Sequence, residues 1–253
     1  MGTPVIVAAR RTPIGKFFGS LARVPAPVLG SYAIKAVLED APGAKEHVEA
    51  CFMGNVLQAG LGQNPARQAG LKAGLADTLN AVTVNKVCGS GLEAVMQAAT
   101  MIRVGDAECA VAGGMENMDL APHLAQVRAG IKYGDGKLVD HMANDGLTCA
   151  FECWPMGNAA EHTASTSGVT RAAQDAFSVE SHRRAAEATK NGWFKKEMVA
   201  LTPEQCMGKT GLDADEGFRA DSSVDALAKL RPAFSKEGTV TAGNASQISD
   251  GAA

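Results

Sequence analysis

Two periods of hydrophobic and polar positions alternate along the first half of the chain. Short apolar runs typical of buried strands are separated by longer stretches in which apolar residues recur every three or four positions, as in a helix. The predicted strands cover residues 5–9, 50–53, 81–85 and 108–112, and the predicted helices cover residues 28–40, 64–73 and 91–103. Strands and helices that alternate in this way predict an α/β layered domain with a mostly parallel sheet.

The pattern changes from about residue 116 to residue 243, where strands and helices no longer alternate and Gly, Asp and Asn are frequent. One helix is predicted in this stretch, at residues 171–190, with Thr170 as its N-cap and Asn191 and Gly192 at its end. A long excursion of this kind is usually functional. We therefore expect three ranges, namely a core at residues 1–115, an inserted region at 116–243 and a return to the core at 244–253.

Composition argues against two classes of partner. The chain has 253 residues, a formal net charge of −3 and only 5% aromatic residues, without a cluster of basic side chains. Nucleic acid and anionic membranes are therefore poor expectations for a partner. No apolar run has the length of a membrane span, and the start of the chain lacks a signal-peptide pattern.

The chain contains six cysteines, which lie at positions 51, 88, 109, 149, 153 and 206. They lack the spacing of a disulfide framework, so we expect reduced thiols and a cytoplasmic protein. Cys149 and Cys153 together with His162 could suggest zinc. Because the spacing is loose and no fourth ligand is evident, we expect no metal.

Cys88 is the candidate nucleophile. It follows the strand predicted at residues 81–85 and precedes a helix whose apolar residues fall at helical spacing. Those residues are Leu92, Val95, Met96, Ala99 and Ile102. The dipole at the start of a helix favours a thiolate, and Gly89 and Gly91 leave room for a substrate to approach the backbone. The alternative interpretation is a small buried hydrophobic residue, the commonest role of a cysteine near a strand end.

Residues 85–91, Asn-Lys-Val-Cys-Gly-Ser-Gly, resemble the nucleophile motif of thiolases, the family of acetyl-CoA acetyltransferases and 3-ketoacyl-CoA thiolases. Further segments resemble the family in the same order. They are residues 5–15 (Val-Ile-Val-Ala-Ala-Arg-Arg-Thr-Pro-Ile-Gly), 113–118 (Gly-Gly-Met-Glu-Asn-Met), 229–234 (Lys-Leu-Arg-Pro-Ala-Phe) and 238–246 (Gly-Thr-Val-Thr-Ala-Gly-Asn-Ala-Ser). The nearest rival is a β-ketoacyl synthase, which also places a cysteine at a strand–helix turn, but residues 238–246 fit thiolases better.

The resemblance implies a thiolase-like layered αβα core with a large inserted loop domain that covers coenzyme A. It also implies that Cys88 forms an acyl-enzyme, either to condense two acetyl-CoA into acetoacetyl-CoA or to cleave a 3-ketoacyl-CoA. Acyl-CoA would be a substrate, with no permanently bound cofactor, and the protein would form a dimer or tetramer. By the same resemblance, residues on the loop domain would bind coenzyme A: Leu147, Met156, Arg219, Phe234, Ala242 and Ser246.

Two positions depart from the acetoacetyl-CoA-forming pattern. Pro155 stands where those thiolases often have histidine, and Ala226 stands where some members have serine. The acyl-chain length is therefore left open. Glu116 and Asn117 follow Gly113 and Gly114 at a strand end, where they could support the site or cap a turn, and we favour the cap.

The resemblance covers only the N-terminal part of a thiolase. The Gly-His-Pro, Cys-x-Gly-Gly-Gly and Asn-Glu-Ala-Phe motifs of the second thiolase domain are absent from the sequence. The family's catalytic bases would then come from a C-terminal partner or from sequence beyond this chain. Two other interpretations are a coenzyme A-binding module without turnover and a scaffold without an independent function.

Overall fold

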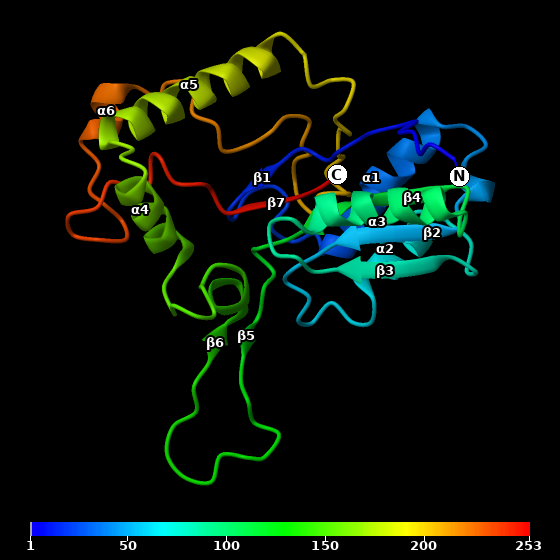
Figure 1. The fold of residues 1–253 in the computed structure, drawn as a ribbon, viewed down its shortest axis with the longest axis horizontal. Helices are drawn as coiled ribbons and strands as arrows, with labels where there is room; N and C mark the ends of the chain where they lie inside the picture. Colours follow the sequence, from blue (N-terminus) through cyan, green and yellow to red (C-terminus); the bar gives the residue numbers. More distant parts are fainter. Residues whose placement is uncertain (1) are drawn as a thin grey trace. The chain divides into compact units, whose positions relative to one another are not determined.

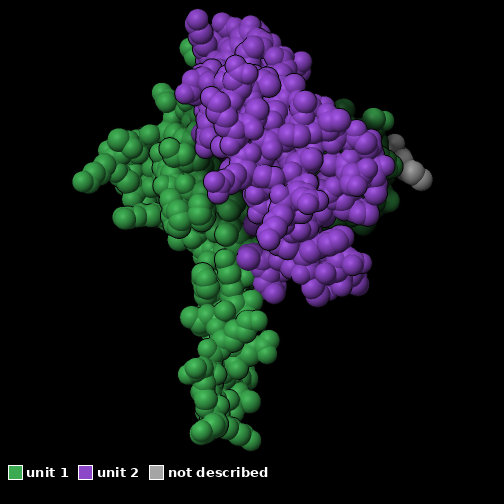
Figure 2. All heavy atoms as spheres, turned by 90° about the vertical axis from the view of Figure 1, so that its left-hand side faces the viewer, with its two compact units in different colours: residues 1–142, 195–216, 248–253 green, residues 143–194, 217–247 purple. Residues whose placement is uncertain are grey.

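The computed structural model describes residues 2–253 (Figure 1). Contacts between residues divide the chain into two compact units. Unit 1 contains the residues up to Met142, Lys195–Glu216 and Ile248–Ala253, and unit 2 contains Ala143–Phe194 and Gly217–Gln247 (Figure 2). Residues 116–142 and 195–216 therefore group with the N-terminal core. The assignment of the whole range 116–243 to a domain that covers coenzyme A stays a prediction.

A five-stranded mixed sheet forms the centre of unit 1. Its strand order is β1 (Gly15–Lys16), β7 (Ser249–Ala252), β4 (Ala110–Glu116), β2 (Ala50–Gly54) and β3 (Asn80–Val84). β2 pairs in parallel with β3 and β4, whereas β7 is antiparallel to β4 and to β1. The predicted parallel sheet is confirmed for the three strands β4, β2 and β3.

Side chains of β2 alternate between two hydrophobic clusters, one on each face of the sheet. Cys51 and Met53 belong to the cluster that also contains residues of α1 (Ala26–Asp40) and α2 (Pro65–Lys72). Ala50 and Phe52 belong to a second cluster with residues of α3 (Ser90–Val104). Because successive strand residues point to opposite faces, the helices cover both sides of the sheet, and the layered αβα core is confirmed.

The apolar stripe of α3 faces away from the sheet. The sheet-facing residues are the small Ala94 and Ala98, which are buried, whereas Leu92 is 69% exposed and Met96 is also exposed. Alanines let the helix axis approach the strands closely, so the larger side chains are left on the outside. The helical period was predicted correctly, but it marks a surface that unit 1 does not cover.

The strand predicted at residues 5–9 is wrong for this chain. Residues 5–9 have no assigned strand, and Val5, Ile6 and Val7 are 73%, 81% and 74% exposed. Within residues 2–253, no strand pairs with this segment. Backbone hydrogen bonds to the core begin only later, where Arg11 N–H donates to Glu197 O and Thr12 N–H donates to Ala252 O, both at 2.8 Å. An apolar run predicts an extended segment, but a strand also needs a neighbour.

The segment Lys195–Glu216 is tied to the start of the chain by charge. Arg11 binds both carboxylate oxygens of Asp215, at 2.6 Å and 2.9 Å, and its Nε donates to Glu197 at 2.7 Å. Leu201 and Leu212 pair with each other and join the larger hydrophobic cluster. These contacts explain why part of the expected insertion belongs to the core.

Asp250 is a buried carboxyl group on β7. Its Oδ1 accepts a hydrogen bond from Met118 N–H at 2.7 Å. Burial, with the neighbouring carboxyl of Asp119 adding to it, raises the pKa of Asp250 to about 7. Asp119 in turn accepts from Phe18 N–H at 3.0 Å and 2.8 Å. A pair of acids thus joins β7 to two loops of unit 1.

The remaining elements of unit 1 are short. η1 (Lys45–His47) precedes β2, and β5 (His123–Leu124) pairs with β6 (Val139–Asp140) in an antiparallel hairpin. The hairpin loop is exposed, including Tyr133 at its tip. This hairpin is the two-stranded second sheet of the fold.

Unit 2 is helical and rich in polar contacts. It contains α4 (Met156–Thr166), α5 (Arg171–Lys190) and α6 (Val224–Ala228), and a π-helical turn (Met142–Gly146) lies at its start. The helix predicted at 171–190 is confirmed, and Thr170 accepts from Ala173 N–H at 3.2 Å as the N-cap. Among the described residues, no helix is long and apolar enough to cross a membrane.

Candidate functional site

The backbone around Cys88 makes a tight turn between β3 and α3. Val87 has a left-handed φ of 48°, and Gly89 N–H donates to Lys86 O at 3.1 Å. The Ser90 hydroxyl accepts from Lys86 N–H at 2.8 Å and donates to Val87 O at 2.6 Å. The turn is therefore fixed on both sides of Cys88, whose side chain is exposed. Within residues 2–253, Cys88 is therefore not a buried hydrophobic residue.

Gly54 brings the turn to the carboxyl ends of the parallel strands. A β-carbon at position 54 would lie 2.6 Å from the backbone N of Gly91, a distance that side chains do not tolerate. The end of β2 and the first turn of α3 can touch only because glycine stands here. Ligands in open α/β sheets bind beyond the carboxyl ends of the strands, so the turn places an accessible thiol where such a site is expected.

Glu116 and Asn117 have different roles at the end of β4. The Glu116 carboxylate accepts from Asn55 Nδ2 at 2.6 Å and from the backbone N–H of Val56 and Leu57 at 2.8 Å and 3.2 Å. Burial raises the pKa of Glu116, and these donors oppose the shift. Asn117 caps a turn, because its Oδ1 accepts from Leu120 N–H at 2.7 Å. The expected cap is thus seen at Asn117, while Glu116 holds the loop that follows β2.

Three of the residues that the resemblance assigns to coenzyme A lie together in unit 2, around the start of α4. Met156 N–H donates to Leu147 O at 2.8 Å. The next residue, Gly157, lies against the ring of Phe234, where a β-carbon would collide with the ring, and Asn158 Nδ2 donates to Phe234 O at 3.2 Å. Leu147 is half-buried, whereas Met156 and Phe234 are exposed, so an apolar surface is available to a ligand.

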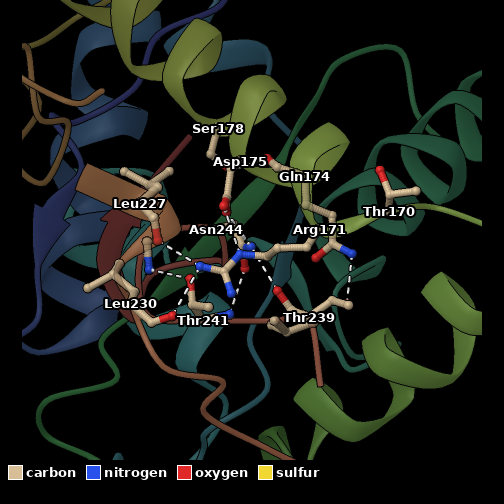
Figure 3. Close-up of polar contacts among 12 residues, drawn as sticks. Thr170, Arg171, Gln174, Asp175, Ser178, Leu227, Leu230, Thr239, Thr241 and Asn244 are labelled. Carbon is tan, nitrogen blue, oxygen red and sulfur yellow. Dashed lines mark hydrogen bonds and ion pairs between the residues drawn. The ribbon is translucent and has the colours of Figure 1, made fainter. Parts of the chain in front are cut away.

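Ala242 lies in a turn fixed by the side chain of Asn244. Asn244 Oδ1 accepts from Thr241 N–H at 2.7 Å, and Asn244 Nδ2 donates to Thr239 O at 3.0 Å. The same amide donates to Asp175 Oδ1 at 2.9 Å (Figure 3). Ala242 and Ser246 are both exposed. The turn therefore presents these two residues while its own polar groups are bonded inward.

Asp175 connects this turn to the helices of unit 2. Its side chain is 2% exposed and pairs with Arg171 Nε at 2.7 Å. Arg171 Nη2 in turn donates to the carbonyls of Leu227 and Leu230, at 2.6 Å and 3.1 Å (Figure 3). Asp175 thus joins α5 to the turn that carries Ala242, and its partner Arg171 joins α5 to the end of α6.

Glu161 on α4 holds the preceding segment. Its carboxylate accepts from Thr239 N–H at 2.8 Å, from the Thr239 hydroxyl at 2.9 Å and from Val240 N–H at 2.8 Å. Desolvation alone would raise the pKa of Glu161, but these hydrogen bonds outweigh it and lower the pKa. Glu161 is therefore an ionised anchor for the segment that leads to Ala242.

Arg219 is held on a different part of unit 2. Its backbone N–H donates to His182 Nδ1 on α5 at 3.1 Å, and the residue is exposed. The backbone of Arg219 is thus held beside α5, and its side chain is exposed to solvent. Arginine suits the phosphate and adenine end of a nucleotide, because it pairs with phosphate and stacks on aromatic rings.

The anchoring residues Arg171, Asp175, Asn244 and Glu161 were not predicted from the sequence. An Arg and an Asp four residues apart on a helix indicate a solvent-exposed pair. Nothing in the spacing shows that this Asp is buried by segments about seventy residues away. Within residues 2–253, no three His, Cys, Asp or Glu side chains are grouped so that they could hold a metal ion.

Residues 4–253 match the family described as "Thiolase, N-terminal domain". The match covers nearly the whole chain, including the turn at Cys88 and the anchored segments of unit 2, so this chain belongs to the thiolase family.

Similar proteins carry a more specific name. The chain is 54% identical over 250 residues to an acetyl-CoA acetyltransferase of Chromobacterium violaceum, covering 98% of this chain and 64% of that protein. It is 52% identical over 251 residues to the acetyl-CoA acetyltransferases of Cupriavidus necator and Escherichia coli, with the same coverage. The chain thus spans less than two thirds of the length of these relatives.

Proposed function

We propose that this chain carries the nucleophile and part of the coenzyme A site of an acyl-CoA C-acyltransferase of the acetyl-CoA acetyltransferase type. The observation that carries the proposal is the exposed Cys88 in a fixed turn at the start of α3. The relatives' name, acetyl-CoA acetyltransferase, supports the same substrate class.

In the first step of the proposed reaction, the Cys88 thiolate attacks the carbonyl carbon of an acyl-CoA thioester. The acyl group moves to Cys88 Sγ, and coenzyme A leaves as a thiolate that takes up a proton. Cys88 directly precedes the N-cap of α3, where the developing negative charge of the attacked thioester would lie near the positive end of the helix dipole.

In the second step, the α-carbon of another acyl-CoA loses a proton and attacks the acyl-enzyme. A new carbon–carbon bond forms, and Cys88 is released. Two acetyl-CoA molecules would give acetoacetyl-CoA, and the reverse direction would be thiolytic cleavage of a 3-ketoacyl-CoA. The acid–base groups for these proton transfers are proposed to come from the part of the thiolase that lies outside the match.

Unit 2 would bind the coenzyme. Leu147, Met156 and Phe234 supply an apolar surface for the pantetheine arm, and Ala242 and Ser246 would meet its amides. Arg219 would lie at the nucleotide end. Asp175 and Glu161 would act indirectly, because they hold the turn that presents Ala242 and Ser246.

Association is the third part of the proposal. β3 is the outer strand of the sheet and pairs only with β2 among the described strands. Its Val82 is exposed, as are Leu92 and Met96 on α3. An open strand edge beside apolar side chains favours pairing with another chain. A second copy or the C-terminal portion of the enzyme would fit, and sedimentation velocity of this chain tests for self-association.

The proposal is tested by intact-protein mass spectrometry after incubation with acetyl-CoA. We expect one acetyl adduct on the wild-type chain, mixed with its C-terminal portion if the chain alone does not react. The adduct should disappear in Cys88→Ala. Cys153→Ala is the matched control, because it removes another exposed thiol and should keep the adduct. An adduct that persists in Cys88→Ala would refute Cys88 as the nucleophile.

The second candidate function is coenzyme A binding without turnover. It is favoured by the arrangement of unit 2, which by itself contains all six residues assigned to the coenzyme, whereas Cys88 belongs to unit 1. Calorimetric titration with coenzyme A separates the two functions. Binding that is weakened by Arg219→Ala, without any acetyl adduct, would select this alternative.

A further inference from the structure

Cys149 and Cys153 lie at the tip of a short hairpin in unit 2. The two arms meet where Met156 N–H donates to Leu147 O at 2.8 Å, and Thr148 forms an antiparallel bridge with Pro155. Nearer the tip, Cys149 N–H donates to Trp154 O at 2.9 Å. The chain therefore reverses direction between the two cysteines.

A single turn separates the two cysteines. Cys153 N–H donates to Cys149 O at 2.9 Å, which is the spacing of one turn of an α-helix. This hydrogen bond joins the carbonyl next to the Cys149 Cα atom to the amide next to the Cys153 Cα atom, so the two Cα atoms are at most about 7 Å apart. Disulfides join Cα atoms separated by roughly 4.4–6.8 Å, so the hairpin holds the two cysteines close to the required range.

Both sulfur atoms contact the same peptide group. Cys149 Sγ accepts from Glu152 N–H at 3.5 Å, and Cys153 Sγ donates to Phe151 O at 3.9 Å. The Phe151 carbonyl and the Glu152 amide belong to one peptide unit between the cysteines. The carbonyl and the N–H of a trans peptide point in opposite directions, so the two thiols lie along opposite edges of this peptide unit. Each side chain must rotate away from its contact before the sulfurs can meet.

The other cysteines are less suited to exchange. Burial raises the pKa of the Cys51 thiol to about 12, and burial also raises the pKa of Cys109 and of Cys206. A raised pKa lowers the fraction of reactive thiolate. Cys153 is exposed and Cys149 is partly exposed, and the neighbouring Phe151 is 94% exposed. A small disulfide in solution can therefore reach the tip of the hairpin.

We propose that Cys149 and Cys153 form a dithiol modification site that closes to an intramolecular disulfide by exchange with a low-molecular-weight disulfide. The Cys153 thiolate attacks one sulfur of the small disulfide and releases one small thiolate. The Cys149 thiolate then attacks Cys153 Sγ and releases the second. Two protein thiols are oxidised to one disulfide, one small disulfide is reduced to two thiols, and the two protons lost by the cysteines go to the released thiolates.

The disulfide would be a reversible one. It closes a ring of only five residues in an exposed turn, and Cys153 has a left-handed φ of 56° that side chains rarely adopt. Exposed or strained disulfides have higher reduction potentials than structural ones and are the labile type. The same hairpin carries Leu147 and Met156, so oxidation would act on the coenzyme A surface. That consequence rests on the proposed function, whereas the dithiol itself does not.

The test uses glutathione buffers of increasing oxidised fraction. The free thiols are trapped with iodoacetamide, and the protein is digested with trypsin and with a protease that cleaves after glutamate. Glu152 lies between the two cysteines, so cleavage there separates them into two peptides. The oxidised protein should give these two peptides joined and two hydrogen atoms lighter than their sum. Added reductant should separate them.

Two variants test whether Cys149 and Cys153 are the cysteines that are joined. Cys153→Ser should abolish the joined product and leave Cys149 free or carrying glutathione, because the second thiol is missing. Cys109→Ser should leave it unchanged, since the partly buried Cys109 belongs to unit 1, where it directly precedes β4. The whole series is repeated in Cys88→Ser to exclude exchange through the exposed nucleophile.

The proposal is overturned if both peptides stay separate in fully oxidised glutathione, or if each cysteine carries glutathione without being joined. It is also overturned if the wild-type peptide that contains Cys149 is found joined to a peptide of another cysteine in place of the one that contains Cys153. Absence of an acetyl adduct at Cys88 would contradict the proposed function and leave this result unaffected, so the two failures are distinguishable.

Discussion

The polar network of unit 2 gives the sharpest prediction for stability. The perturbation is Asp175→Asn, which keeps the shape of the side chain and removes its charge. Asp175 accepts from Arg171 Nε at 2.7 Å and from Asn244 Nδ2 at 2.9 Å, both as a carboxylate. An asparagine can offer only one oxygen and would turn its own NH2 group toward one of these donors. Either Arg171 Nε or Asn244 Nδ2 then loses its acceptor at a buried position.

The expected loss in the free energy of unfolding follows from the burial of Asp175 and Arg171. Removing one member of a buried ion pair costs about 3–5 kcal/mol. The Arg171 side chain is 25% exposed, so water can partly solvate the unpaired guanidinium, and we expect the lower end, about 3 kcal/mol. With a urea m-value of about 1–2 kcal/mol/M, the unfolding midpoint should fall by about 1.5–3 M.

Tryptophan fluorescence in urea is the assay. The chain has two tryptophans, Trp154 and Trp193, and both belong to unit 2, so the signal reports on the unit that is perturbed. Glu180→Gln on the same helix is the matched control. Glu180 pairs with Arg183 and Arg184 on the surface of α5, where solvent screens the charges, and its loss should hardly move the midpoint.

A midpoint for Asp175→Asn that falls no further than that of Glu180→Gln would refute the reasoning. It would mean that the contacts drawn in Figure 3 follow the packing of the helices and do not hold the unit together.

Three other outcomes are expected. The pKa of Asp250 is raised from an ordinary value of 3.8 to about 7, so the folded chain keeps a proton on this carboxyl group that the unfolded chain releases. The stability that this proton contributes should therefore be lost as the pH rises from 3.8 to about 7. Asp250→Asn should flatten that part of the stability–pH curve, measured by urea unfolding at several pH values; an unchanged slope would contradict it. Gly157→Ala should displace the Phe234 ring and weaken coenzyme A binding in calorimetry, and equal affinity would exclude the packing argument. Gly54→Ala should cost about 1–3 kcal/mol by overpacking and lower the melting temperature; a wild-type value would show that the turn at Cys88 can shift freely.

Local signals in the sequence predicted much of the fold. The N-cap Thr170 and the terminator Asn191-Gly192 defined α5 at Arg171–Lys190, because capping is decided by nearby residues. The strand and helix around Cys88 were likewise predicted, and α3 begins at Ser90, one residue before the prediction. These features depend on hydrogen bonds within a few positions of the chain.

Features that depend on distant partners could not be predicted. Residues 5–9 have the pattern of a strand, but none of the described strands lies beside them. The apolar stripe of α3 faces outward because alanines face the sheet. The buried Asp175 looks like a surface residue of α5, since its partner Asn244 lies 69 positions away. A period shows that a segment is amphipathic, but it does not show what covers the apolar side.

The position of β7 has a consequence for the order of folding. This strand, Ser249–Ala252, lies between β1 and β4, and Thr12 Oγ1 accepts from Ala252 N–H at 3.0 Å across 240 residues. During synthesis the chain must therefore wait, with β1 unpaired, until residues 249–252 have left the ribosome. Closing so large a loop is slow compared with helix formation. The three parallel strands can assemble early, and the edge of β4 then remains open to wrong partners while the residues between Glu116 and Ser249 are synthesised.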